Sequence, residues 1–129
     1  MESTKPILGY WKIRGLAHQI RYMLNYLNVD FHDELFEQGD GPEFCRKVWL
    51  DKKDTLGLDF PNLPYYIDGP TKLTESGAIM KFIAAKYDAK LLGVGAHEQG
   101  HVEMLFGVII DMKNDVTMKC YTTDNNQLT

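Results

Sequence analysis

The 129-residue sequence has little cysteine, no excess of basic charge and no long apolar run. Its two cysteines, Cys45 and Cys120, form no CxxC pair, so we expect free thiols in a cytoplasmic protein, with one disulfide between them as the alternative. Lysine and arginine number 14 against 18 acidic residues, which gives no electrostatic footprint for nucleic acid or an anionic membrane. The longest apolar run, Met104–Ile110, is far shorter than the roughly 20 residues of a membrane span. Small neutral or acidic molecules remain open as ligands.

The first part of the sequence predicts a strand, a helix and a second strand. Ile7–Tyr10 is a short apolar run, and after Gly15 the apolar residues recur at helical spacing. A second strand is expected over Phe31–Phe36, which follows a turn. The stretch Glu37–Leu56 is charged and punctuated by glycine, which favours a loop with one short helix.

The next part predicts two antiparallel strands and a helix. Tyr65–Ile67 and Lys72–Thr74 flank the turn residues Asp68–Pro70. Ser76 is expected to be the N-cap of the helix that follows. A βαβ unit followed by ββα is typical of the thioredoxin-like α/β fold, which we predict for residues 1–88.

Residues 89–129 predict the start of a second, all-α domain. Gly93 and Gly95 mark a linker before it. Beyond them, apolar residues recur at the spacing of an amphipathic helix, namely Val102, Leu105, Ile109 and Met112.

Residues 97–101 match the zinc-peptidase motif HExxH, which places two histidines one helical turn apart with a glutamate base between them. Gly100 weakens the helix by about 1 kcal/mol relative to alanine. A third ligand would have to come from an acid outside the motif, namely Glu103, Asp111 or Asp124. We therefore interpret the motif as a solvated helix start, keep a zinc hydrolase only as a distant alternative, and predict no metal.

Three features of the first 88 residues suggest a site for a peptide with a thiol. Tyr10–Ile13 occupies the loop where a thioredoxin-like redox protein carries its CxxC, and the Tyr10 phenol could donate a hydrogen bond to a ligand's thiolate. Ser76 at a helix N-terminus favours a carboxylate. Leu63-Pro64 resembles a cis-proline position whose exposed backbone pairs with a peptide. Each feature alone also fits a structural role: a core tyrosine, a helix cap and a proline at a strand start.

Taken together, three segments closely resemble the cytosolic glutathione transferases of the Mu class. They are Pro6–Leu16, Leu56–Tyr65 and Leu73–Ser76, and the match runs in order over essentially the whole chain. The resemblance implies conjugation of reduced glutathione, a co-substrate, to hydrophobic electrophiles by a homodimer that needs no cofactor. It also implies that the helical domain continues beyond Thr129.

The resemblance also implies roles for individual residues. Tyr10 would be the catalytic tyrosine that stabilises the glutathione thiolate. The other glutathione-binding residues would be Trp11, Arg46, Trp49 and Lys53 at the glycine carboxylate, Asn62, Leu63 and Pro64 along the backbone, Glu75 and Ser76 at the γ-glutamyl end, and Asp111 from the neighbouring subunit. Phe60 would belong to the dimer interface and Tyr121 to the electrophile site.

Two departures from the Mu pattern keep a second interpretation open. The class usually has glutamine where this chain has Glu75, and much of the electrophile pocket lies in the helical domain that would follow Thr129. The alternative is a non-catalytic relative that binds glutathione or apolar ligands, or that acts as a structural subunit.

Overall fold

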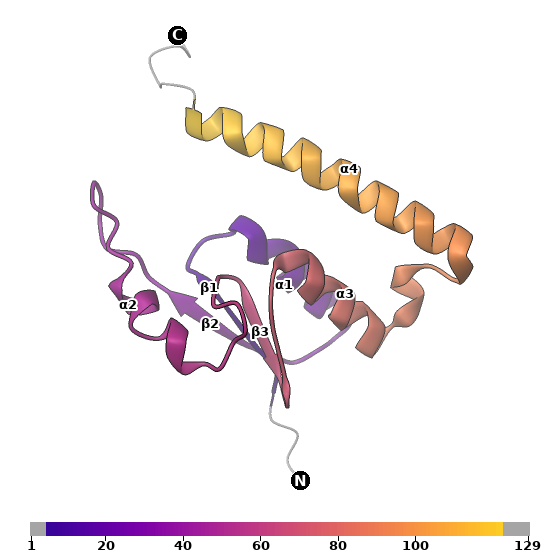
Figure 1. The fold of residues 1–129 in the computed structure, drawn as a ribbon, viewed down its shortest axis with the longest axis horizontal. Helices are drawn as coiled ribbons and strands as arrows, with labels where there is room; N and C mark the ends of the chain where they lie inside the picture. The colour runs from indigo at the N-terminus through magenta and orange to yellow at the C-terminus, as the bar shows by residue number, and fades with distance from the viewer. Residues whose placement is uncertain (1–4, 123–129) are drawn as a thin grey trace. The chain divides into compact units, whose positions relative to one another are not determined.

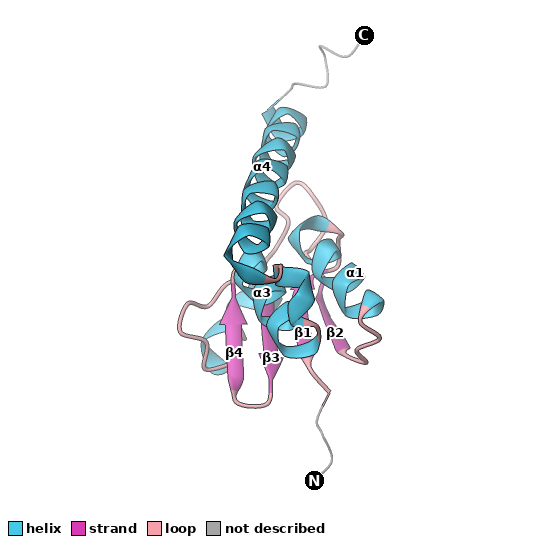
Figure 2. Cartoon of the chain, turned by 90° about the vertical axis from the view of Figure 1, so that its right-hand side faces the viewer, coloured by secondary structure: helices cyan, strands magenta, loops and turns pink. Residues whose placement is uncertain are grey.

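The computed structural model describes residues 5–122, which fall into two compact units with the boundary between Asp88 and Ala89. The N-terminal unit contains a four-stranded sheet in the order β2-β1-β3-β4 (Figure 2). Its strands are β1 (Ile7–Trp11), β2 (His32–Phe36), β3 (Tyr65–Asp68) and β4 (Thr71–Thr74). β1 runs parallel to β2 and antiparallel to β3, and β3 pairs antiparallel with β4. This mixed sheet confirms the predicted thioredoxin-like fold.

Helices cover both faces of this sheet, and Figure 1 shows α2 on one side with α1 and α3 on the other. The helices are α1 (His18–Tyr26), which follows a 3-10 turn at Gly15–Ala17, α2 (Lys47–Leu50), which precedes a 3-10 turn at Lys53–Thr55, and α3 (Ser76–Tyr87). Because neighbouring strand residues point to opposite faces, Tyr66 packs toward Phe82 of α3 while Tyr65 stacks on Trp49 of α2. The two faces therefore have separate packing partners.

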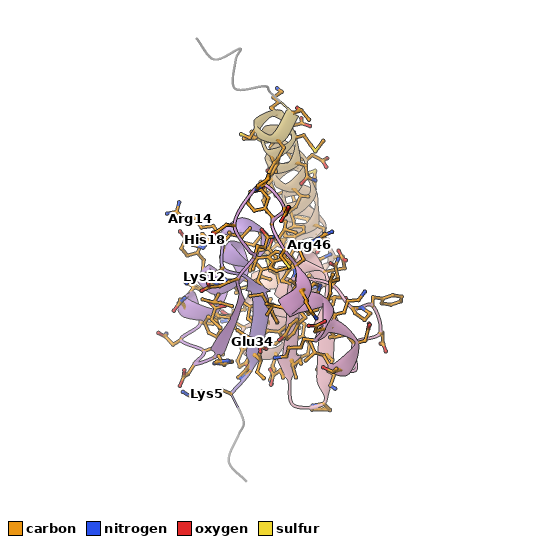
Figure 3. All side chains as sticks on the ribbon, turned by 90° about the vertical axis from the view of Figure 1, so that its left-hand side faces the viewer. Lys5, Lys12, Arg14, His18, Glu34 and Arg46 are labelled. Carbon is orange, nitrogen blue, oxygen red and sulfur yellow. The ribbon has the colours of Figure 1, made fainter. Side chains whose placement is uncertain are left out.

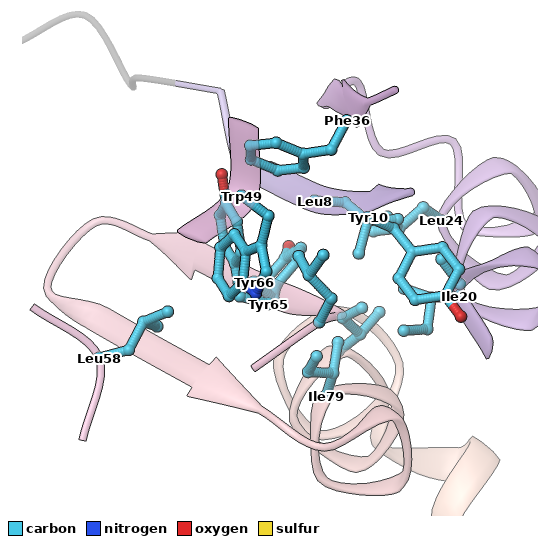
Figure 4. Packing of buried hydrophobic residues seen from close by; sticks show 13 residues of the cluster. Leu8, Tyr10, Ile20, Leu24, Phe36, Trp49, Leu58, Tyr65, Tyr66 and Ile79 are labelled. Atoms are coloured by element: carbon cyan, nitrogen blue, oxygen red, sulfur yellow. The ribbon is translucent and has the colours of Figure 1, made fainter. Parts of the chain in front are cut away.

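The hydrophobic core joins β1 and β3 to α1 and α3 (Figure 4). Its members without solvent exposure come from these four elements and from the 3-10 turn before α1, namely Leu8, Ala17, Ile20, Leu24, Tyr65, Tyr66, Ile79 and Ile83. The apolar side chains that recur at helical spacing on α1 meet those of the strands here, as the sequence pattern predicts. Both cysteines of the chain are exposed free thiols.

The start of α3 corrects one prediction. Ser76 is the first helical residue, and the N-cap is Glu75, which has φ +70° and no side-chain capping bond. The Glu75 carbonyl accepts the first helical hydrogen bond, from the Ile79 N–H at 3.0 Å. The chain thus enters the helix through a backbone turn one residue earlier than a serine cap requires.

The C-terminal unit consists of a 3-10 turn (Ala89–Leu92) and the helix α4 (Gly95–Thr122). α4 begins earlier than the apolar spacing from Val102 suggests, and Gly100 lies inside it. Glu98 accepts a hydrogen bond from the Val94 N–H at 2.7 Å, which satisfies one of the free donors at the helix start. No helix within residues 5–122 is long and apolar enough to cross a membrane.

A buried carboxylate ties α3 to β3. Asp68 is 8% exposed, and one of its oxygens accepts hydrogen bonds from Lys86 at 2.5 Å and from the Tyr87 hydroxyl at 3.1 Å. The Tyr66 hydroxyl lies 3.5 Å from the same oxygen, and burial, helped by these neighbours, raises the pKa of Tyr66. The hydrogen bond to Asp68 raises the pKa of Lys86. Asp68 therefore fixes the C-terminal end of α3 on the sheet.

Replacing this carboxylate should measurably destabilise the chain. Asp68→Asn removes the charged acceptor, and we expect a loss of about 1–2 kcal/mol in the free energy of unfolding, allowing for the solvent exposure of Lys86. Urea denaturation followed by circular dichroism measures it. Asp30→Asn is the matched control. Asp30 pairs with Lys5, and because the side chains of Lys5 and Asp30 are 62% and 73% exposed, this ion pair should contribute little to stability. Equal losses in the two variants would contradict the role given to Asp68.

Candidate functional site

Tyr10 lies near the end of β1 with its hydroxyl directed at the turn that begins the next helix. The side chain is only 7% exposed, and its oxygen accepts a hydrogen bond from the Leu16 N–H at 3.2 Å. Gly15 has φ +39°, and a Cβ at this residue would lie 2.6 Å from the Tyr10 oxygen. The glycine thus permits both the turn and the contact. Because the tyrosine oxygen accepts from the backbone, its own proton is available for a second partner.

Arg21 holds the loop that follows Tyr10. Its guanidinium donates to Asp33 of β2 at 2.8 Å and to the Ile13 carbonyl at 3.0 Å. The arginine side chain is 15% exposed, so this bridge is largely shielded from water. A planar guanidinium that contacts a carboxylate and a carbonyl fixes α1, β2 and the loop relative to one another.

Strand register brings three of the predicted site segments to one end of the sheet. Gly9 pairs with Tyr65, and Tyr65 pairs with Thr74. Continuing these antiparallel pairings places Tyr10 and Trp11 next to the stretch Leu63-Pro64, which in turn lies next to the start of α3. We call this region, residues 10–11, 63–64 and 75–76, the site end of the sheet.

The Leu63–Pro64 peptide bond is cis, as the resemblance predicts. Both residues are buried, whereas Asn62 is exposed. The Asn62 side-chain oxygen accepts a hydrogen bond from the Leu63 N–H at 2.9 Å. A ligand backbone that pairs with this N–H would have to displace the asparagine side chain or share the donor with it. At the neighbouring α3 start, Glu75 is exposed and Ser76 is half-buried.

The residues expected at the glycine carboxylate lie on and around α2. Arg46 is exposed immediately before the helix, as Figure 3 shows, and Lys53 is half-buried after it. Trp49 is only 6% exposed and packs within an aromatic cluster. Its ring stacks on Tyr65 at 6.0 Å and meets Phe36 edge-on at 5.4 Å. Trp49 is therefore first a packing residue, and its contact with a ligand stays a prediction.

A cavity of about 310 Å³ opens beside Trp11. Trp11 and Phe36, whose rings meet edge-on at 6.4 Å, form its apolar wall. The opposite wall comes from the loop after β2, residues 37–41 together with Phe44. Lys12 also lines it and pairs with Glu37 at 2.5 Å. The cavity thus combines aromatic surface with charged groups close to the site end of the sheet.

The remaining predicted residues lie elsewhere in the described structure. Phe60 is 79% exposed on the N-terminal unit. Asp111 and Tyr121 are both exposed on α4, in the C-terminal unit. The structure therefore gives these three residues positions but does not test their roles.

The HExxH segment lies on α4 with its two histidine rings 4.4 Å apart. Glu98 is used as a cap for the Val94 N–H, and the His101 ring contacts the His97 carbonyl at 2.9 Å. Within residues 5–122, no group of three or more His, Cys, Asp or Glu side chains is arranged to hold a metal ion. Asp124, one candidate third ligand, lies outside the described residues. The described side chains thus supply no third ligand for a zinc hydrolase.

Comparison with known proteins agrees with this geometry. Residues 6–85 match the family described as the glutathione S-transferase N-terminal domain. The chain belongs to the glutathione S-transferase family. Glutathione S-transferase B of Cavia porcellus is 45% identical over 120 residues, which cover 93% of this chain and 54% of that protein. Glutathione S-transferase Mu 1 of Bos taurus is 44% identical over 122 residues, covering 95% and 55%.

Solved structures of the family have the same fold. The crystal structure of the glutathione S-transferase Blo t 8 superposes with a TM-score of 0.80 at 36% identity, covering 94% of this chain and 53% of that one. A Pi-class glutathione S-transferase of Onchocerca volvulus gives 0.78 at 27% identity, covering 93% and 52%. The chain spans about half the length of these relatives. The Mu-class relatives confirm the resemblance inferred from the three sequence segments.

Sequence reasoning missed three sets of contacts that lie beside the predicted site residues. They are Gly15 against Tyr10, the Arg21 bridge, and a hydrogen-bonded group formed by Glu34, Lys52 and Tyr65. The signals in the sequence are a glycine five residues after the tyrosine and the charged residues at the centre of the strand expected over Phe31–Phe36. Neither signal identifies its partner.

Gly15→Ala should lower the free energy of unfolding by more than the cost of placing alanine in a left-handed backbone conformation. Gly69 has φ +59° with no atom within 4 Å of a built Cβ, so Gly69→Ala carries only the conformational cost, about 1 kcal/mol. At Gly15 the added methyl group also meets Tyr10, and we expect a further loss of about 1–3 kcal/mol. Urea denaturation of the two variants measures the difference. If they are equally stable, Gly15 does not constrain Tyr10.

Proposed function

We propose that this protein is a glutathione transferase that adds the thiolate of reduced glutathione to hydrophobic electrophiles. The observation that carries the proposal is the Tyr10 hydroxyl, which accepts a backbone hydrogen bond at the site end of the sheet and keeps its proton for a ligand. In this role, the tyrosine donates that proton in a hydrogen bond to the glutathione sulfur and remains protonated. The thiol proton leaves to solvent, and the sulfur forms a bond to the electrophilic carbon while the bond from that carbon to its leaving group breaks and the leaving group departs as an anion.

The energy required is within the range of such a contact. Lowering a thiol pKa from about 8.5 to about 7 raises its ionised fraction at neutral pH from a few per cent to about half. This corresponds to about 2 kcal/mol of preferential stabilisation of the thiolate, and one hydrogen bond to a charged group contributes about 1.5–3 kcal/mol. The Leu16 N–H polarises the Tyr10 hydroxyl and strengthens it as a donor.

The rest of the tripeptide would be oriented by the neighbouring segments. Arg46 and Lys53 supply positive charge for the glycine carboxylate, with Trp11 and Trp49 beside them. Asn62, Leu63 and Pro64 supply backbone groups that can pair with the cysteinyl residue. Ser76 and the free N–H groups at the start of α3 suit the γ-glutamyl carboxylate, and Glu75 suits its ammonium group.

Within this proposal, the C-terminal unit contributes to the electrophile site, and the C-terminal unit and Phe60 both contact the second subunit. Asp111 would reach glutathione in the partner subunit, Tyr121 would contact the electrophile, and Phe60 would insert into the dimer interface. Phe60 is accessible for such a contact, because its side chain is 79% exposed.

A non-catalytic glutathione-binding protein is the second candidate. The observation that favours it is that the predicted glutathione-binding residues other than Asp111 all lie in the N-terminal unit, whereas Tyr121, predicted for the electrophile site, is exposed on α4. Such a protein would bind glutathione without turnover.

Tyr10→Phe separates the two candidates. For a transferase, we expect turnover with a generic aromatic electrophile to fall about 10–100-fold, the equivalent of one charged hydrogen bond, while glutathione affinity changes less than about threefold. Spectrophotometric conjugation assays and titration calorimetry measure the two quantities. Tyr26→Phe is the control, because Tyr26 is 71% exposed on α1. Binding without turnover in the unmodified chain would favour the second candidate, and turnover unchanged in Tyr10→Phe would exclude the role of this tyrosine.

A further inference from the structure

A hydrogen-bonded group lies beneath α2 on the face of the sheet opposite α1 and α3. Glu34 of β2 accepts hydrogen bonds from the Lys52 ammonium on one carboxylate oxygen and from the Tyr65 hydroxyl on the other. The side chains of Glu34 and Lys52 are 25% and 38% exposed. Tyr65 has no exposed surface and lies across Gly9, where a Cβ would stand 2.1 Å from its ring. One carboxylate thus connects two strands with the segment that follows α2.

Residues 46–53, which we call the 46–53 segment, depend on such contacts for their position. α2 is only four residues long and the 3-10 turn after it only three, and helices this short are not stable by themselves. Lys52 lies at the junction of the two, where its N–H donates to the Trp49 carbonyl at 3.0 Å and its carbonyl accepts from the Thr55 N–H at 2.9 Å. The Trp49 ring and the Lys52 ammonium are therefore the two anchors of this segment on the sheet.

The charge of this group is fixed at neutral pH. Burial raises the pKa of Glu34, but the hydrogen bonds from Lys52 and Tyr65 outweigh it, so the pKa of this carboxyl lies below its ordinary value. Burial and the neighbouring carboxylate both raise the pKa of Tyr65. The Lys52 ammonium also lies 5.7 Å from the centre of the Phe36 ring. A carboxylate, an ammonium and a neutral phenol therefore make up the group.

The 46–53 segment carries four basic side chains, and two of them form ion pairs. Lys47 pairs with Asp51 at 2.5 Å, and Lys52 pairs with Glu34. Within residues 5–122, neither Arg46 nor Lys53 has an ion pair or a side-chain hydrogen bond. These two cations remain for an anionic ligand, on either side of the anchored Trp49.

We propose that Glu34, Lys52 and Tyr65 are positioning residues that hold the 46–53 segment so that Arg46 and Lys53 meet the glycine carboxylate of glutathione. This inference rests on the proposed function. The group does not touch the ligand. It fixes the positions of Arg46 and Lys53, which would contact the ligand. Because Lys52 is paired with Glu34, it does not compete with them for the glycine carboxylate.

Charge reversal tests the inference in this chain. Glu34→Lys and Lys52→Glu each break the pair with opposite changes in net charge, so a general electrostatic effect would shift glutathione affinity in opposite directions. Loss of positioning instead predicts that both variants bind glutathione about tenfold more weakly, and that the double variant recovers to within about threefold of the unmodified chain. Titration calorimetry measures the dissociation constants.

A second ligand distinguishes positioning from a general loss of structure. In glutathione esterified at the glycine carboxylate, the group that Arg46 and Lys53 would meet carries no charge. We expect both single variants to bind this ester within about threefold of the unmodified chain, because the rest of the site is retained. Equal losses for glutathione and its ester, or no loss for either, would overturn the inference.

Two controls complete the experiment. Lys47→Glu and Asp51→Lys disrupt an exposed pair in the same segment, with side chains 73% and 62% exposed, and should change glutathione affinity less than about twofold. If circular dichroism shows that a charge-reversed variant does not fold, Tyr65→Phe replaces it, because this change removes only the hydroxyl. Tyr65→Phe should weaken glutathione binding about threefold and leave binding of the ester unchanged. Unchanged glutathione binding in Tyr65→Phe would overturn the inference. Absence of glutathione binding in the unmodified chain would reject the proposed function itself.

Discussion

The candidate site depends on the close pairing of β1 with β3 at Gly9. Tyr65 lies where a side chain at Gly9 would be, since a Cβ there would stand 2.1 Å from the tyrosine ring. This contact sets the register that places Tyr10 next to the cis proline and the proline next to the start of α3. Any larger residue at this position would push the strands apart or expel the ring, because a packed core cannot absorb such an overlap.

Tyr65 also connects the paired strands to the 46–53 segment. Its ring supports Trp49, and its hydroxyl donates to Glu34, which in turn accepts from Lys52. The opposite face of the same sheet is held by separate contacts, the Arg21 bridge near β2 and the Asp68 group on β3. The Arg21 bridge on one face therefore holds the loop after Tyr10, and the contacts on the other face hold the segment that carries Arg46 and Lys53.

Sequence patterns predicted the elements well because each follows from local spacing. The two short strand-like runs Tyr65–Ile67 and Lys72–Thr74 on either side of a turn predicted a hairpin, and the resemblance predicted the cis bond before Pro64. Ser76 was misplaced by one residue because a capping serine and a first-turn serine look alike in sequence. The bond between Glu34 and Lys52 could not be predicted, since the two are 18 residues apart and join only when α2 packs on the sheet.

Trp49 shows how the packing of the 46–53 segment and its proposed contacts with the ligand depend on the same side chain. The resemblance assigns it to the ligand, yet its ring is 6% exposed and packs between Phe36 and Tyr65. A segment with only two short helical turns has little internal stabilisation, so the same ring that fills the cluster must hold the backbone from which Arg46 and Lys53 extend. The positions of Arg46 and Lys53 thus depend on the Trp49 packing and the Glu34–Lys52 pair, whereas the Tyr10 hydroxyl is held at the end of a central strand by the Leu16 N–H and Gly15.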